Sequence, residues 1–326
     1  MIRIVIVFLL MVYSGYGYAQ EIKDSVLSTA NRISYLSEKV DRFNKEPLYQ
    51  LEVESLFSFS ILINDCPVYS NFDKISGMVR LDINPYILKS GKQLITVELY
   101  PGYDHQNMRK AYLENGSKFI LKIEKTGWGK DGILNKPEEI LSYKTADETT
   151  DLTKLQTYKR DISFNASVPY RLDGWKNGKD LTQLDRKQLE QEVLNFYKQI
   201  ISAFERNDYD ALNSHFLKAD AEWYQSMYFS EDIITRFQTT KGRKAKSVVT
   251  TLSGSQQNSR TFFPLENYAL RFYGDGRMVR LEPREGINKG ESLLGYEDDK
   301  NGMSRRTFVD MLLYIPKGET ALKIVR

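Results

Sequence analysis

Cysteine and histidine are scarce in this chain of 326 residues. Cys66 is the only cysteine, so the chain cannot close an internal disulfide, and its stability must come from packed cores. The two histidines, His105 and His215, fall in different predicted domains, which excludes a two-histidine zinc site within one domain. No phosphate-binding loop, Gly-x-Ser-x-Gly elbow or cysteine–histidine nucleophile pattern occurs, so these enzyme classes have no support.

An excess of one charge is also missing. The chain has 46 Lys and Arg residues against 43 Asp and Glu residues, a formal net charge of +3. This balance excludes a broad field that attracts polyanions, and nucleic acid is not expected as a partner. The run Lys241–Lys246, which holds four cations, is interpreted as a charged strand edge that discourages pairing with other chains.

No hydrophobic run is long enough to span a bilayer, which takes ~20 residues. The nine-residue run Ile4–Val12 follows Arg3 and precedes Gly17-Tyr18-Ala19, with small residues at both recognition positions. This pattern predicts a secretory signal over residues 1–19, cleaved after Ala19. We therefore expect a soluble, secreted mature protein without a membrane span. A disulfide-free exported chain best fits a bacterial periplasm.

Residues 20–46 are predicted to form an amphipathic helix. Their apolar positions alternate steps of three and four, as in a short heptad pattern, and Pro47 marks the end. The seam consists of Val26, Thr29, Ile33, Leu36, Val40 and Phe43. Two interpretations stay open: the helix packs on its own domain, or residues 22–43 join two copies as a homodimer.

Residues 47–172 are predicted to form an antiparallel β-sandwich. Apolar and polar residues alternate over several short segments separated by turn residues, which is typical of strands with one buried face. The expected strands cover 57–63, 79–83, 95–99, 119–124 and 162–168. Asn64-Asp65 follows the first of these segments and offers a tight turn.

Part of this region resembles jelly-roll, galactose-binding-like accessory domains. The resemblance rests on residues 64–68 and 82–97, where Leu88-Lys89-Ser90-Gly91 forms a turn between two expected strands. Gly91 can adopt the left-handed conformation that ends such a turn. The resemblance concerns packing and carries no ligand residues, so a glycan-binding accessory protein is an alternative by fold analogy only. That alternative needs exposed aromatic residues on one sandwich face.

Residues 173–183 read as a linker, because Gly174 and Gly178, with Pro169 just before them, separate the strand period from a helix period. Trp175 within it is expected to dock the linker onto a domain, or else to act as a binding anchor. A long helix follows from Leu184. Its apolar residues share one helix face and need a partner surface to bury them. They are Leu189, Val193, Phe196, Tyr197, Ile200, Ile201 and Phe204.

Residues 184–326 resemble the NTF2-like (SnoaL-like) fold. The resemblance is carried by the long helix, the phrase from Phe204 to Leu212, a second short helix and a run of expected strands. These strands cover 247–252, 265–273, 278–282, 307–315 and 321–325, with a hairpin at Gly274–Arg277. The resemblance implies a first helix lying against a curved sheet, with a pocket inside the cone. The expected fold class is α+β with two domains, an N-terminal antiparallel β-sandwich followed by an NTF2-like cone.

The implied pocket suggests one catalytic constellation. His215 lies on the second helix, with Asp208 and Asp220 nearby in the sequence, so a histidine–aspartate acid/base pair is possible there. The alternative is that the aspartates cap helix ends and that the histidine is held within its helix. Residues 297–302 have carboxylates and a glycine at calcium-loop spacing, but the twelfth position is Phe308, so we interpret them as a solvated turn. No metal or other cofactor is expected.

An aromatic cluster follows the second helix. Trp223, Tyr224 and Tyr228 either fill the core or frame a pocket mouth that takes a flat or apolar ligand. The function that the sequence favours is a secreted, periplasmic, non-catalytic binding protein of two domains, which binds a protein partner or an envelope component. The alternatives are an enzyme or small-ligand binder that uses the cone pocket, and the glycan-binding accessory protein.

Overall fold

The computed structural model describes residues 31–74, 77–129, 133–238, 261–300 and 303–326. The predicted signal at residues 1–19, the cation run at 241–246 and the strand expected at 247–252 lie outside these ranges. The described chain is rich in antiparallel sheets, with a smaller share of helix. None of its helices combines the length and the apolar character that a membrane crossing requires.

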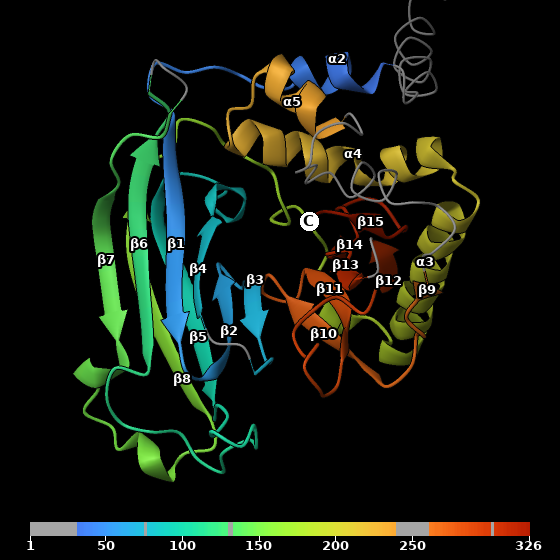
Figure 1. Cartoon of the computed structure of the whole chain (residues 1–326). Coiled ribbons are helices and arrows are strands. Elements are labelled where there is room, and N and C mark those ends of the chain that lie inside the picture. The colour runs from blue at the N-terminus through green and yellow to red at the C-terminus, as the bar shows by residue number, and fades with distance from the viewer. Residues whose placement is uncertain (1–30, 75–76, 130–132, 239–260, 301–302) are drawn as a thin grey trace, which may run out of the picture.

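The N-terminal half consists of two facing four-stranded antiparallel sheets, here called the sheet pair (Figure 1). The first sheet has the order β4 (Gly77–Asp82), β1 (Pro47–Ser55), β6 (Phe119–Gly127) and β7 (Glu138–Lys144). The second has the order β3 (Cys66–Asn71), β2 (Ser58–Ile63), β5 (Gly91–Tyr100) and β8 (Tyr158–Ala166). Short 3-10 helices follow β4 at Asn84–Tyr86 and β7 at Thr145–Asp147. A third lies at Leu152–Lys154, in the connection from β7 to β8.

Alternating apolar residues from both sheets fill the space between them. Ile61 and Val97 from the second sheet are fully buried with Leu121 from the first. The rings of Phe59 and Phe119 meet edge to face across the two sheets, with centroids 5.4 Å apart. Asn64 and Asp65 both have positive φ and form the predicted tight turn between β2 and β3. Period-two patterning therefore predicted the buried residues of β2, β5 and β6, whereas Val79 and Leu81 of β4 are only half-buried.

The described residues of the C-terminal half form three helices and two antiparallel sheets. The helices are α3 (Arg186–Glu205), α4 (Tyr209–Ser226) and α5 (Glu231–Gln238), after a 3-10 turn at Leu181–Gln183. One sheet has the order β10 (Tyr268–Tyr273), β11 (Met278–Pro283), β14 (Leu313–Tyr314) and β15 (Lys323–Ile324). The other has the order β13 (Met303–Phe308), β12 (Gly295–Lys300) and β9 (Thr261–Phe262). Residues 297–300 belong to β12, so the interpretation of 297–302 as a solvated turn is wrong for its described part.

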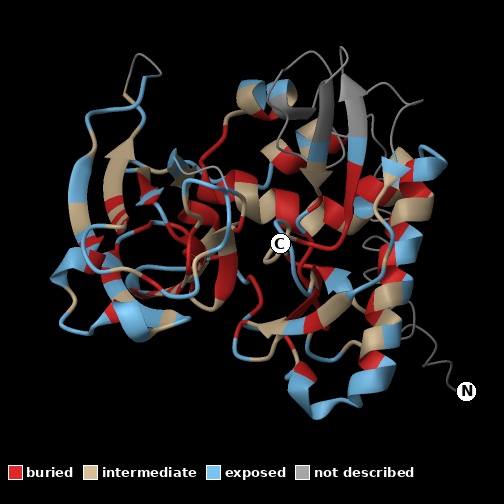
Figure 2. Cartoon of the chain, turned by 60° about the horizontal axis from the view of Figure 1, so that its bottom comes forward, coloured by how far each residue is buried: buried red, intermediate tan, exposed pale blue. Residues whose placement is uncertain are grey.

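Helix α3 buries the predicted stripe against the C-terminal sheets. Asp185 caps its start, where its carboxylate accepts a hydrogen bond from the Gln188 amide at 2.8 Å. Six of the seven stripe residues are buried, while Ile201 is half-buried. Lys198 and the other polar residues of the opposite face are exposed (Figure 2). The helix ends where Asn207 takes a positive φ, and Asp208 then caps α4.

The structure describes residues 31–46 of the helix predicted over 20–46. Of these, only α2 (Arg32–Ser37) is helical, and Pro47 already begins β1. The described seam residues Ile33, Leu36, Val40 and Phe43 pack against the chain's own core. The described part of the seam therefore packs within the chain, which supports the first interpretation, and the homodimer through residues 22–43 stays a prediction. Residues 22–30 lie outside the described ranges.

Residues 173–183, predicted as a loose linker, are packed between the two halves. Trp175 is fully buried, as expected for a docking residue, and Leu181 is buried with it. The Gly174 amide donates to Glu222 at 3.1 Å, and the Lys179 amide donates to Ile315 at 2.9 Å. The backbone of this connector is therefore held by partners in the C-terminal half.

The two halves share a hydrophobic core. Helix α4 leads from α3 towards the sheet pair (Figure 1), and its end places Tyr224 and Tyr228 among the core residues of that pair. A buried ion pair reinforces the contact, because Arg326 approaches Glu222 at 2.6 Å and also donates to the Pro85 carbonyl at 3.2 Å. A second core lies between α3 and the C-terminal sheets.

Candidate functional site

A polar cleft of about 290 Å³ lies where the two halves meet. Strands β2, β3 and β5 form one wall, and β10, β11 and the loop before residue 291 form the other. Aromatic rings and charged groups line it together. The lining includes Ser60, Ser70, Phe72, Thr96, Glu98, Tyr100, Arg271, Tyr273, Arg280, Glu282 and Lys289.

Two hairpin turns fix the width of the cleft. The β10–β11 turn docks on the β2–β3 turn, where Gly274 and Asp275 donate their amides to the carbonyl and carboxylate of Asp65, both at 2.8 Å. Gly274 has φ +62, and a Cβ atom there would lie 2.5 Å from the Trp175 ring. Glycine is therefore required at 274 both for the turn and for this close approach.

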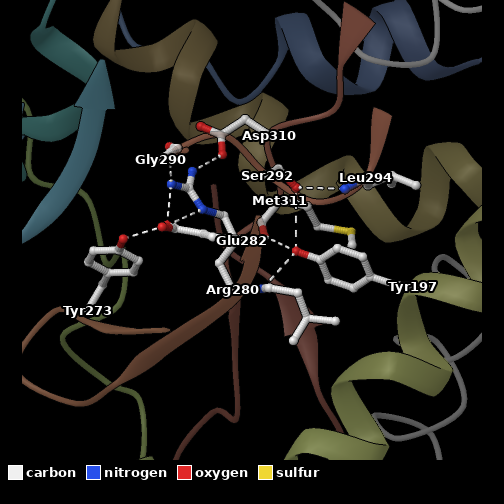
Figure 3. Close-up of polar contacts among 10 residues, drawn as sticks. Tyr197, Tyr273, Arg280, Glu282, Gly290, Ser292, Leu294, Asp310 and Met311 are labelled. Carbon is white, nitrogen blue, oxygen red and sulfur yellow. Dashed lines mark hydrogen bonds and ion pairs between the residues drawn. The ribbon is translucent and has the colours of Figure 1, made fainter. Parts of the chain in front are cut away.

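Arg280 is the centre of a buried polar network on the β11 wall (Figure 3). Its guanidinium donates to the Glu282 carboxylate at 2.6 Å, to the Asp310 carboxylate at 2.7 Å and to the Gly290 carbonyl at 2.8 Å. Burial alone would lower the pKa of Arg280, but the two carboxylates outweigh burial and raise it well above its usual range. Arg280 is thus a fixed, internally neutralised cation.

Tyr273 extends this network from β10. Its hydroxyl donates a hydrogen bond to the Glu282 carboxylate that also holds Arg280. Burial and the negative charge of Glu282 both raise the pKa of Tyr273, so the phenol stays protonated and serves as a donor. Glu282 is therefore oriented by an arginine on one side and by a phenol on the other.

Two other cations of the cleft are not neutralised in this way. The Lys289 ammonium lies 4.2 Å from the centroid of the Tyr100 ring and 4.9 Å from that of Phe72. Burial, and then the charge of Arg271, lower the pKa of Lys289. Within the described residues, neither Lys289 nor Arg271 forms an ion pair. Arg271 lies directly opposite Arg280 in the β10–β11 ladder, an arrangement of like charges that is unfavourable by itself.

The pKa of Glu291, which follows Gly290 of the cleft lining, is also shifted by its surroundings. Burial and the nearby carboxylate of Asp310 raise the pKa of Glu291 to about 7. This group can therefore change charge near neutral pH. Taken together, the cleft offers unneutralised cations, aromatic faces and oriented hydroxyl and carboxylate groups, which can bind and orient a small polar molecule that carries a negative charge.

The predicted histidine–aspartate constellation is not assembled. Asp208 caps α4 by accepting a hydrogen bond from the Ala211 amide at 3.1 Å. Asp220 is buried in an ion pair with Arg32 of α2. His215 is half-buried, with its ring edge to face against Phe196 at 5.3 Å, and burial lowers its pKa. The capping alternative therefore holds for Asp208 but not for Asp220, which lies inside α4.

The predicted ligand-binding aromatics belong to the shared core. Tyr224 and Tyr228 are almost fully buried, and Trp223 is half-buried. The Trp223 ring lies 5.1 Å from Tyr224, and the Tyr228 ring lies 5.6 Å from Tyr170. These residues join α4 to the sheet pair, which supports the core-filling alternative, and ligand binding by them stays a prediction.

The residues that line the cleft were missed by the sequence analysis, although one signal was available. Arg280 and Glu282 share a face of β11, while Val279 and Leu281 on the other face enter the core behind α3. Alternation of this kind usually indicates a solvent-exposed polar face. Here the sheet pair covers that face, and only the tertiary arrangement reveals it.

Comparison with known protein families, curated proteins and solved structures found no match. The resemblances to the NTF2-like and jelly-roll folds therefore stay predictions. Among the residues that the structure describes, no group of three or more His, Cys, Asp or Glu side chains is placed to hold a metal ion.

Proposed function

We propose that the protein is a secreted, periplasmic, non-catalytic binding protein built from a β-sandwich and an NTF2-like α+β domain. The two facing sheets support the first assignment, and α3 packed along the C-terminal sheets supports the second. Export rests on the signal-like residues 1–19. A protein or envelope partner, predicted from the sequence, remains part of this proposal.

The proposed ligand site is the cleft between the two halves, and one observation carries the proposal. Arg271 and Lys289 enter a concave, partly buried space without a carboxylate partner among the described residues. Arg271 is exposed and Lys289 is half-buried, so the two cations repel each other and Lys289 also loses hydration. A bound anion relieves both effects. Arg280 keeps its own carboxylates and holds the wall in place. Lys159, the fourth cation of the lining, lies 3.8 Å from the Glu98 carboxylate, so Arg271 and Lys289 are the two cations left for a ligand.

The rest of the lining narrows the class of ligand to a small hydroxylated acid, of the size of a sugar acid. The hydroxyl groups of Ser60, Ser70 and Thr96 and the carboxylate of Glu98 suit a molecule rich in hydroxyl groups. Aromatic faces suit the apolar side of a sugar ring. A volume of about 290 Å³ is just below the range of drug-sized sites, which is ~300–1,000 Å³.

Thermal unfolding of the mature full chain in the presence of D-glucuronate, D-glucose or acetate tests the proposal. A ligand that binds only the folded state raises Tm. We expect glucuronate to raise Tm more than either of the other two at equal concentration and ionic strength, because it alone has both the ring hydroxyls and the carboxylate.

Arg271→Gln should remove most of the glucuronate effect. The control is Arg284→Gln, which removes another exposed arginine just beyond β11 and outside the cleft lining. The site assignment fails if Arg271→Gln keeps the wild-type shift. The ligand class fails if acetate and glucuronate act equally.

A further inference from the structure

A second concave surface lies on the other side of the β2–β3 turn from the cleft. It is a groove of about 620 Å³, lined by the loop that leads into β5 and by the connector between the halves. Asn64 of the turn borders this groove, while its neighbour Asp65 borders the cleft. The groove therefore has its own walls and contains none of the cleft's cations.

The groove has a strong excess of positive charge. Its cations are Lys89, Lys92, Arg171 and Lys176, and its lining holds a single carboxylate, Asp173. All four cations are exposed. Lys176 approaches Asp275 only at 3.9 Å, and the other three form no ion pair with any residue that the structure describes. The near-neutral charge of the whole chain thus hides a local surplus at this place.

The backbone that carries these cations is held rigidly. Gln93, only 4% exposed, donates its side-chain amide to the carbonyls of Lys89 at 3.1 Å and of Gly91 at 2.9 Å, and accepts from Asn64 at 2.8 Å. On the opposite side, the Leu172 amide donates to the Leu88 carbonyl at 2.8 Å. This last bond ties the connector to the β5 loop.

These bonds hold the backbone that carries Lys89 and Lys92 at a fixed separation from the backbone that carries Arg171 and Lys176, before any ligand binds. A preorganised site loses little conformational entropy on binding. Four like charges around one concave surface also raise the local positive potential, because low-dielectric walls focus the field. Both properties favour a ligand with several negative charges close together over a monovalent anion.

We infer that this groove binds a compact ligand carrying two or more adjacent phosphate groups. Each phosphate offers several acceptor oxygens, and the planar guanidinium of Arg171 can engage two of them at once. The three lysines supply point charges that reach neighbouring phosphates from both sides of the groove. The inference is independent of the ligand proposed for the cleft.

Isothermal titration calorimetry of the mature full chain with inorganic tripolyphosphate tests this inference. The titration is run at roughly 50 and roughly 200 mM NaCl, where the Debye length is about 14 Å and about 7 Å, respectively. We expect saturable binding that weakens with salt, and much weaker binding of orthophosphate. The double variant Lys92→Gln/Arg171→Gln should lose at least ~10-fold in affinity, since each removed charge acts across only a few ångströms.

Two control variants distinguish binding in the groove from binding elsewhere on the protein. Lys187→Gln/Lys198→Gln removes two exposed cations from α3 and should leave the affinity unchanged. Arg271→Gln, in the cleft, should do the same. The inference is overturned if wild-type protein does not bind tripolyphosphate at the lower salt concentration, or if the α3 double variant loses as much affinity as the groove variant. A loss of affinity in Arg271→Gln without a loss in the groove variant would also overturn the inference, because the binding site would then be the cleft.

Discussion

Tyr197 carries its hydroxyl from α3 into the core of the C-terminal half. The oxygen accepts a hydrogen bond from the Leu281 amide at 3.2 Å and lies 3.4 Å from both the Ser292 hydroxyl and the Met311 carbonyl. Removing it leaves buried polar groups without a partner, which costs ~1–3 kcal/mol. We expect Tyr197→Phe to destabilise the protein by about this amount in urea melts, and Tyr112→Phe, on an exposed tyrosine, by under ~0.5 kcal/mol. Equal effects would contradict the buried contact.

Glu291 makes the stability of the folded chain depend on pH. Its folded pKa of about 7 lies above the usual value of 4.5, since burial disfavours the charged form. The unfolded chain therefore releases this proton at lower pH than the folded chain does. The penalty on the folded state is absent below pH 4.5, grows as pH rises to about 7, and is complete above it.

Glu291→Gln removes this penalty. We expect the variant to match the wild type at about pH 4 and to be more stable by roughly 2 kcal/mol at about pH 8, measured by urea unfolding across this range. Glu266→Gln serves as the control, because Glu266 is exposed. If both variants follow the same pH profile, the buried position of Glu291 is not responsible.

Helix α3 is the element for which sequence and structure agree best. Its apolar stripe predicted which side faces the sheets, because helical period is a local property that tertiary contacts seldom change over a helix of this length. We expect Phe204→Ala, at a residue that is 2% exposed, to cost ~3–5 kcal/mol through lost burial and a cavity. Lys198→Ala, on the exposed face, should change stability by under ~0.5 kcal/mol. Denaturant melts of the full chain with similar small effects for both would show that the stripe is not buried.

The strands were predicted less accurately than helix α3. Segments with clear alternation, such as 57–63 and 95–99, coincide with β2 and β5. Strand β1 was not predicted. Four consecutive residues in it are buried, Leu48, Tyr49, Gln50 and Leu51, and this hides the period of two. The expected strand over 307–315 was too long, since only Leu313–Tyr314 pairs as β14 while β13 ends at Phe308.

The candidate site could not be derived from such local patterns. Arg271 and Tyr100 are far apart in the sequence and line one cleft only because the β10–β11 turn docks on Asp65. Asp220 illustrates the opposite error, because its proximity to His215 in the sequence suggested a pair, whereas its carboxylate binds Arg32 instead. Residues close in sequence were easy to group, and those brought together by the shared core were not.

At the scale of the whole molecule, the shared core decides how the chain unfolds. Separate domains joined by a free linker would melt independently. Here the end of α4 lies in the core of the sheet pair, Trp175 is buried in the connector, and Arg326 pairs with Glu222 across the joint. Neither half keeps its core intact if the other unfolds, so one cooperative transition is expected.

Two core variants test this expectation. Ile61→Ala lies in the sheet pair and Val193→Ala lies on α3, and both positions are fully buried. Each should cost roughly 2–4 kcal/mol, and each should lower one common midpoint for both halves. Hydrogen exchange of peptides from β5 and from α3, measured as a function of urea concentration, gives a separate midpoint of protection for each half. If Val193→Ala lowers the protection midpoint of α3 while β5 keeps its wild-type midpoint, the halves unfold independently, and the shared core does not couple them.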